Sequence, residues 1–128
     1  FYPNSLNMDK LIIEIYINCS DINKVEYLVS EVNLRRNVDF DLLIELNSDR
    51  DSVKKQIFPD GFLYFTIVLA YYKETDYSLD DIYNSTLLLE KYWSNNICAI
   101  ACCDFEDKLP EKGGYKSEAI YNLMTMNN

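Results

Sequence analysis

The sequence contains no histidine, and it has only three glycines and three prolines in 128 residues. Without histidine, the chain cannot form a Ser-His-Asp triad, a histidine metal site or the usual general base near neutral pH. The glycines form no phosphate-binding loop, so a P-loop and a dinucleotide-binding fingerprint are both excluded. No apolar run approaches the roughly 18 residues of a membrane span. We therefore expect no catalytic site, no metal site and no cofactor.

Positive charge is also scarce in the chain. Its 12 Lys and Arg residues are outnumbered by 21 Asp and Glu residues, which gives a net charge of −9 and a pI near 4.4. Nucleic acids and anionic membranes bind cationic surfaces, so we expect neither as a partner. An acidic chain of this kind instead fits a basic protein partner.

The length and composition predict one globular domain. Apolar residues make up 48 % of the chain and aromatic residues 14 %, which is enough for a sizeable core. The first residues have neither the charged nor the apolar region of a signal peptide, and strand-like sequence begins directly after Met8. We expect residues 1–7 to be a tail, either loose or introduced by cloning, residues 8–128 to form the domain, and the location to be cytoplasmic.

The chain has four cysteines, and three of them are clustered in one apolar run. They are Cys19, Cys98, Cys102 and Cys103. Nothing marks secretion, and a core of this size needs no disulfide, so free thiols are expected. A zinc site needs C-x-x-C pairs or histidines, and the sequence has neither.

Hydrophobic periodicity predicts four strands and two helices. Alternating or continuous apolar residues indicate strands at 10–18, 40–47, 62–73 and 97–105. Helical spacing follows a cap at Ser20 or Asp21 and extends to about 36–37, and a second helix runs from a cap at Ser78 to about 94. A short element, more helix than strand, is expected at 116–123. The residues predicted to share one core are Ile13, Ile15, Val25, Val29, Leu42, Ile44, Leu89 and Trp93.

This order of elements predicts an α+β fold. It is the order of a ferredoxin-like βαββαβ two-layer sandwich, in which a mostly antiparallel four-stranded sheet carries two helices on one face. The short C-terminal element is added after the last strand. In an alternative arrangement of three layers, that C-terminal segment covers the other face of the sheet.

If the helices cover only one face, the other face is available to a partner. The alternation within the first two strands places Glu14, Tyr16 and Glu45 on that face, together with Leu43. Carboxylates pair with guanidinium groups, and aromatic rings supply contact area, so this combination suits a basic protein surface. The alternative interpretation is a solvated sheet face with scattered tyrosines.

A second acidic cluster follows the last predicted strand at Asp104, Glu106 and Asp107. Three carboxylates in so short a stretch could bind a divalent cation or act as an acid–base pair, but their spacing matches no EF-hand loop. A solvated loop and a partner-binding loop are the other interpretations. The candidate partner-binding residues are Asp104, Glu106, Asp107, Glu14, Tyr16 and Glu45.

The segment from Asp104 to Tyr115, DFEDKLPEKGGY, gives the chain a resemblance to known proteins. A small acidic α/β protein with an acidic loop bearing Leu-Pro and Gly-Gly after its last strand resembles bacterial toxin-immunity proteins, including those paired with contact-dependent growth-inhibition toxins. The resemblance implies a cytoplasmic, non-enzymatic protein that binds and neutralises a cognate toxin domain, often a basic nuclease. The immunity families share no residue motif, so no site residue is carried over.

Two other functions are open. One is a small-ligand-binding regulatory module on a ferredoxin-like scaffold, with a pocket at a subunit boundary. The other is a small enzyme that uses carboxylates and tyrosines, which the absence of histidine and of any nucleophile motif disfavours.

Overall fold

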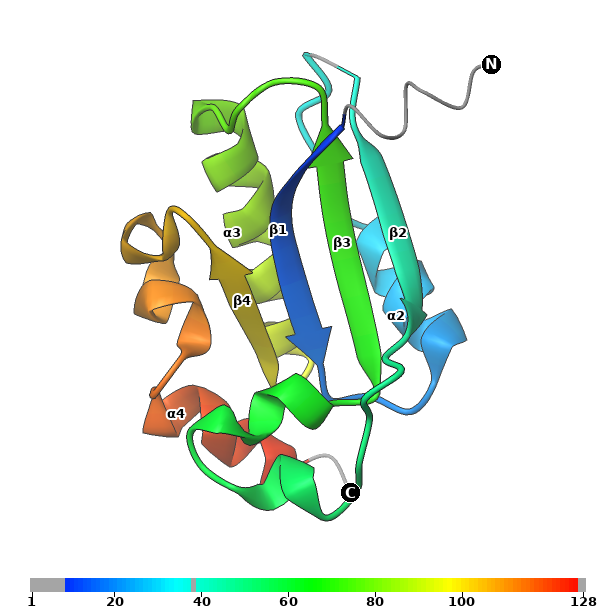
Figure 1. Cartoon of the computed structure of the whole chain (residues 1–128), viewed down its shortest axis with the longest axis vertical. Coiled ribbons are helices and arrows are strands. Elements are labelled where there is room, and N and C mark those ends of the chain that lie inside the picture. Colours follow the sequence, from blue (N-terminus) through cyan, green and yellow to red (C-terminus); the bar gives the residue numbers. More distant parts are fainter. Residues whose placement is uncertain (1–8, 38, 127–128) are drawn as a thin grey trace.

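The computed structural model describes residues 9–37 and 39–126, so the expected tail and its boundary at Met8 lie outside the described residues. Four strands form one antiparallel sheet: β1 (Lys10–Ile17), β2 (Asp41–Leu46), β3 (Ile67–Lys73) and β4 (Ala99–Cys103). Their order across the sheet is β2-β3-β1-β4, so β1 and β3 are the central strands (Figure 1). The predicted α+β fold with a four-stranded antiparallel sheet is confirmed.

Within the described residues, three α-helices accompany the sheet. Helices α2 (Ile22–Ser30) and α3 (Leu79–Ser94) both lie behind the sheet in Figure 1, and α4 (Glu118–Tyr121) follows β4. Asp21 caps α2 as predicted, because its carboxylate accepts hydrogen bonds from the backbone N–H groups of Asn23 and Lys24. The described part of the chain also contains five short 3₁₀ segments: η1 (Lys54–Gln56), η2 (Asp60–Tyr64), η3 (Glu106–Lys108), η4 (Pro110–Gly114) and η5 (Asn122–Thr125).

The main core fills the space between the sheet and the two long helices. Ile13, Ile15 and Ile17 of β1 are fully buried there against Val25 of α2 and Leu89 of α3. All eight residues predicted for the core belong to this cluster, four of them buried and four packed against it while partly exposed. The predicted core is therefore confirmed.

A second, smaller apolar cluster covers one end of the opposite face of the sheet. Ile100 of β4 points into it, away from the helices, and meets Phe62 and Phe65 from the loop before β3. Ile120 and Tyr121 of α4 complete the cluster from the C-terminal segment. This arrangement combines the two alternatives from the sequence, because the C-terminal segment does cover part of the second face.

Two of the predicted elements are too long. The strand predicted at 62–73 begins only at Ile67, because residues 60–64 form η2 and because Phe62 and Phe65 turn into the second cluster. Gly61 lets η2 pack tightly, since a Cβ there would lie 2.5 Å from the carbonyl oxygen of Lys55. The helix predicted to reach about 36–37 ends at Ser30.

A bulge in β1 changes one predicted orientation. Simple alternation along the strand would place Leu11 on the same face as Ile13, but the pairing with β3 shifts between these two residues. Leu11 pairs with Tyr72, whereas Ile13 pairs with Tyr71, so one extra residue, Ile12, is accommodated. Leu11 therefore lies on the opposite face from Ile13 and is exposed.

A buried ion pair ties the end of β3 to the start of α3. Lys73 Nζ lies 2.5 Å from Asp81 Oδ2, and the two side chains are only 3 % and 1 % exposed. Tyr71 donates a hydrogen bond to Asp81 Oδ1, and the backbone N–H of Ser78 donates to Oδ2. Burial acts to raise the pKa of Asp81, but these bonds and Lys73 outweigh it and hold that pKa below its ordinary value.

We expect Asp81→Asn to lower the free energy of unfolding by about 3–5 kcal/mol at pH 7, because it leaves the Lys73 ammonium buried without its counter-charge. Since the pKa of Asp81 is lowered by folding, its contribution is present above its ordinary pKa and is lost as pH falls through the folded-state value. The difference between variant and wild type should therefore shrink in acid. Urea unfolding at several pH values measures it.

Asp80→Asn is the matched control, because Asp80 pairs with Arg35 at the surface. It should cost less than about 1 kcal/mol. Equal losses from the two variants would show that the buried pair contributes no more than the surface pair.

Candidate protein-interaction surface

The candidate site is the part of the second sheet face that no helix of the described residues covers and that lies beside the second apolar cluster. Strand pairing arranges its side chains in rows across the sheet: Leu43, Ala70, Glu14 and Cys102 in one row, and Glu45, Val68 and Tyr16 in the next. Asp41, Tyr72 and Leu11 form a third row. We call this surface the open face; it consists of Leu11, Glu14, Tyr16, Asp41, Leu43, Glu45, Val68, Ala70, Tyr72 and Cys102.

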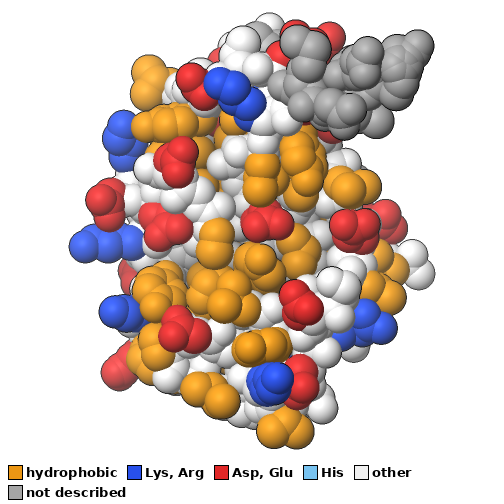
Figure 2. All heavy atoms as spheres, viewed as in Figure 1, with side chains coloured by type: hydrophobic (Ala, Val, Ile, Leu, Met, Phe, Trp, Pro, Cys, Tyr) orange, Lys and Arg blue, Asp and Glu red, His pale blue; other side chains and the backbone are white. Residues whose placement is uncertain are grey.

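The open face combines exposed apolar side chains with carboxylates. Figure 2 views it directly and shows hydrophobic and acidic side chains mixed over the centre of the sheet, with Lys and Arg side chains toward the margins. Leu43 lies between Asp41 and Glu45 on the same face of β2, and its side chain is 47 % exposed. Contiguous exposed apolar area marks interaction sites, whereas single exposed apolar residues are common on any protein surface.

The structure brings together the three sheet residues predicted from the sequence. Tyr16 and Glu45 occupy one row with Val68 between them, so their backbones are two strand spacings, or roughly 10 Å, apart. Glu14 lies in the adjacent row on the same face as Tyr16. The prediction that these residues share a face is therefore confirmed, while their role remains a prediction.

Tyr16 is held in its neutral form at the border of the open face. Its ring meets Phe62 edge-on at a centroid distance of 5.4 Å, and its hydroxyl donates a 3.5 Å hydrogen bond to Glu14. Burial first, and then the negative charge of Glu14, raise the pKa of Tyr16 to about 12. The hydroxyl is therefore a permanent hydrogen-bond donor and is unsuited to act as a base near neutral pH.

Cys102 connects the open face with the acidic loop after β4. Burial, followed by the charges of Glu106 and Glu14, raises the pKa of this thiol to about 12. Glu14 pairs with Cys102 across the sheet, and Glu106 is hydrogen-bonded to the backbone of the neighbouring Cys103, so one residue from each predicted cluster lies near the thiol. A thiol with such a pKa is a poor nucleophile. All four cysteines are free.

The loop cluster is only partly available to a partner. Asp104 and Asp107 are exposed, but Glu106 is half-buried, and its carboxylate accepts a 3.1 Å hydrogen bond from the backbone N–H of Cys103. Glu106 thereby closes the end of β4. Of the three loop residues predicted from the sequence, one has a structural role and two point to solvent.

The backbone beyond this cluster is constrained by its contact with β4. Glu111 and Lys112 adopt left-handed φ values of 54° and 51°, and Gly113 and Gly114 follow with 79° and 95°. A Cβ on Gly114 would lie 3.0 Å from the Ile100 side chain, so the pair of glycines permits close packing. The hollow beside it mixes acids with Lys112 and Lys116, which gives it no single charge preference.

The three residues of the third row, Leu11, Asp41 and Tyr72, were not recognised as site residues from the sequence. Asp41 and Leu43 alternate with Leu42 and Ile44, so the pattern that placed Leu43 also contained Asp41. Tyr72 could not be placed, because the apolar run of its strand is continuous and does not show which side chains share a face. Leu11 could not be placed because the bulge has no sequence signal.

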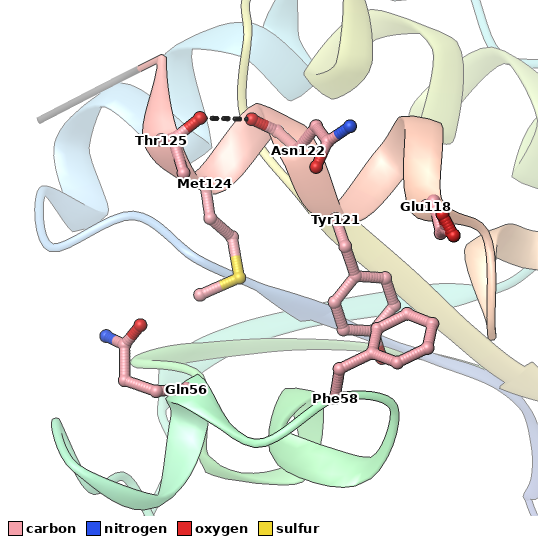
Figure 3. A pocket seen from close by; sticks show the side chains of 7 residues that line it. All are labelled: Gln56, Phe58, Glu118, Tyr121, Asn122, Met124 and Thr125. Carbon is pink, nitrogen blue, oxygen red and sulfur yellow. Dashed lines mark hydrogen bonds between the residues drawn. The ribbon is translucent and has the colours of Figure 1, made fainter.

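A separate groove of about 370 Å³ lies at the other end of the molecule (Figure 3). Phe58 and Tyr121 pack edge-on at its floor with centroids 4.7 Å apart, and the Met124 side chain extends from the C-terminal segment toward Gln56. Only Glu118 among its lining residues carries a charge. The groove mixes apolar and polar side chains, and its chemistry selects no particular partner.

Within residues 9–37 and 39–126, no group of three or more His, Cys, Asp or Glu side chains is arranged to hold a metal ion. Among the helices of that same part of the chain, none has the length and apolar character needed to cross a bilayer. No protein-family model, curated protein or solved structure matches the chain. The functional argument therefore depends on the surface itself.

The cysteine environments predict slow alkylation in the folded state. Burial raises the pKa of Cys98 and Cys102 to about 12 and that of Cys103 to about 11, so the thiolate fraction at pH 8 is far below that of an unfolded chain. We expect iodoacetamide to modify these three residues at least about a hundredfold more slowly in native protein than in urea. Mass spectrometry of timed samples gives the rates, and equal rates would refute these environments.

Proposed function

We propose that this protein is an immunity protein, which binds a cognate bacterial toxin domain and neutralises it through the open face. The partner is a basic protein, with a nuclease domain as the best candidate. The observation that supports this proposal most strongly is the composition of the open face. Exposed Leu11 and Leu43 lie among Glu14, Asp41 and Glu45 on a rigid sheet, with basic side chains at the margins.

This chemistry favours a basic partner for two reasons. Carboxylates on a chain with a net charge of −9 attract a cationic surface over a distance and accelerate association. The apolar residues then supply desolvated contact area, while Tyr16 and Tyr72 add rigid aromatic surface with little loss of side-chain entropy. A toxin that acts on nucleic acid carries the complementary positive charge in its active site.

We also propose that the scaffold is a ferredoxin-like sandwich. The strand order β2-β3-β1-β4, with α2 after β1 and α3 after β3, supports this assignment. The 3₁₀ segments between β2 and β3 and the elements after β4 are additions to that plan. In this assignment the additions limit the open face to the region around β2, β3 and β1.

A small-ligand-binding regulatory module is the second candidate. A hollow of about 580 Å³ beside Asp41, Leu43 and Tyr72 has the size of a ligand site. Its polar groups are two carboxylates and a tyrosine at one border of the open face, and they suit a small cationic ligand. The extent of the open face beyond this hollow favours a protein.

Co-expression tests the proposed function. The wild-type protein should keep host cells alive when they produce the toxin domain encoded immediately upstream of its gene. The combined variant Glu14→Gln and Glu45→Gln should protect poorly, because each substitution removes a carboxylate that neutralises a toxin cation, at a cost of about 2–5 kcal/mol where the pair is buried. Survival counts and the affinity of the purified proteins give the two readouts.

The control is the combined variant Glu26→Gln and Glu90→Gln, which removes the same charge from the exposed helix layer. It should protect as well as the wild type. Equal protection by both variants would be consistent with the proposed function but would refute the open face as its site. Failure of the wild-type protein to protect would refute the function.

A further inference from the structure

The two edges of the sheet differ in how their backbone groups are satisfied. At the β4 edge, Trp93 Nε1 donates a 2.9 Å hydrogen bond to the carbonyl of Ala99, and Glu106 accepts from the N–H of Cys103. Gly114 lies against the same edge, since a Cβ there would be 3.1 Å from the Ala99 carbonyl oxygen. The chain itself therefore blocks strand addition at β4.

The β2 edge is arranged differently. Asn47 N–H donates to the carbonyl of Thr66 at 2.8 Å, which makes these two residues a hydrogen-bonded pair of the β2–β3 ladder. Hydrogen-bonded pairs alternate along an antiparallel ladder, so the N–H and C=O groups of Leu42, Ile44 and Leu46 point away from β3. Within the described part of the chain, no strand pairs with this side of β2.

The side chains beside this edge have a defined order. Asp41, Leu43 and Glu45 project from β2 onto the open face, giving the pattern acid, leucine, acid. A strand added to β2 would place its own side chains about 4.5–5.5 Å from these residues, in the same rows. Opposite charges in such directly opposed positions stabilise a pair of strands.

We propose that the outer edge of β2 is a strand-pairing site for an extended basic segment of the protein partner. The segment carries Lys or Arg beside Asp41 and Glu45 and an apolar side chain beside Leu43. Its backbone bonds to the outward groups of Leu42, Ile44 and Leu46. The identity of the partner rests on the proposed function, whereas the pairing site and its side-chain preference do not.

A second copy of this chain brings like charge to the edge. Antiparallel pairing of two β2 strands centred on Leu43 would set Asp41 of each copy directly opposite Glu45 of the other. Like charges in that position are destabilising, and each copy brings a net charge of −9. Charge complementarity therefore selects a basic occupant.

A synthetic peptide tests the site without the partner. The probe is the peptide Thr-Lys-Val-Leu-Val-Lys-Thr, whose symmetric pattern matches the edge in either strand direction. On titration at low ionic strength, the backbone amide signals of Leu42, Ile44 and Leu46 should move in the NMR spectrum, and their hydrogen exchange should slow about tenfold or more at saturation. A peptide with glutamate in place of both lysines should leave these signals unchanged.

Three results of the titration would overturn the proposal. The first is a peptide response confined to residues outside β2. The second is strong protection of the three amides in the free monomer, which would mean that another segment of the chain already occupies the edge. The third is a concentration-dependent dimer that protects the same amides.

The partner protein tests the same site in a complex. Leu46→Pro removes one outward N–H, and Leu46→Ala, at this 50 % exposed position, removes the side chain but keeps the N–H. Proline should weaken partner binding about tenfold relative to alanine, the effect of one lost hydrogen bond. Equal affinity of two folded variants would refute strand pairing and leave the proposed function intact. If the proline variant does not fold, hydrogen exchange of wild-type β2 in the complex decides instead.

Discussion

Alternation along the central strand β1 is the constraint on which the rest of the structure depends. Ile13, Ile15 and Ile17 leave water completely on one side of the strand, and this apolar row is what α2 and α3 pack against. The same backbone must then present Glu14 and Tyr16 on the other side, because successive side chains of a strand point to opposite faces. The core and the candidate surface are therefore two consequences of one pattern.

The second face is only partly covered, and the limits of that covering define the candidate surface. The cluster around Phe62, Ile100 and Tyr121 buries one end of the face, and Tyr16 lies at its border. Beyond that border, exposed leucines lie among carboxylates. On the other side of the sheet, the buried pair of Lys73 and Asp81 anchors α3 to β3, one of the strands that carry the open face.

Much of the fold could be predicted from the sequence, because periodicity reports which side of an element is buried. The strands around Ile13 and Ile44 and the helix capped at Ser78 follow from it directly. The ends of elements depend on tertiary contacts instead. Phe62, for example, belongs to an apolar run that predicts a strand, but in the structure it lies in η2 and packs into the second cluster. Acidic residues in the first turn of a helix are typical of helix initiation, and the sequence gives no sign that the fold brings Lys73 to Asp81. Alternation within the first two strands placed Glu14, Tyr16 and Glu45 on one face. It did not place Tyr72, because the apolar run of the third strand is continuous and does not show which side chains share a face.

The central claim is that the open face is the surface that contacts a basic protein partner. The most direct measurement is a cross-saturation NMR experiment on the isotope-labelled protein in complex with that partner. The account predicts that signal loss is greatest for Leu43, Glu45 and Tyr72 and is absent from the exposed sides of α2 and α3. Signal loss concentrated on the helix layer, with the sheet residues unaffected, would contradict it.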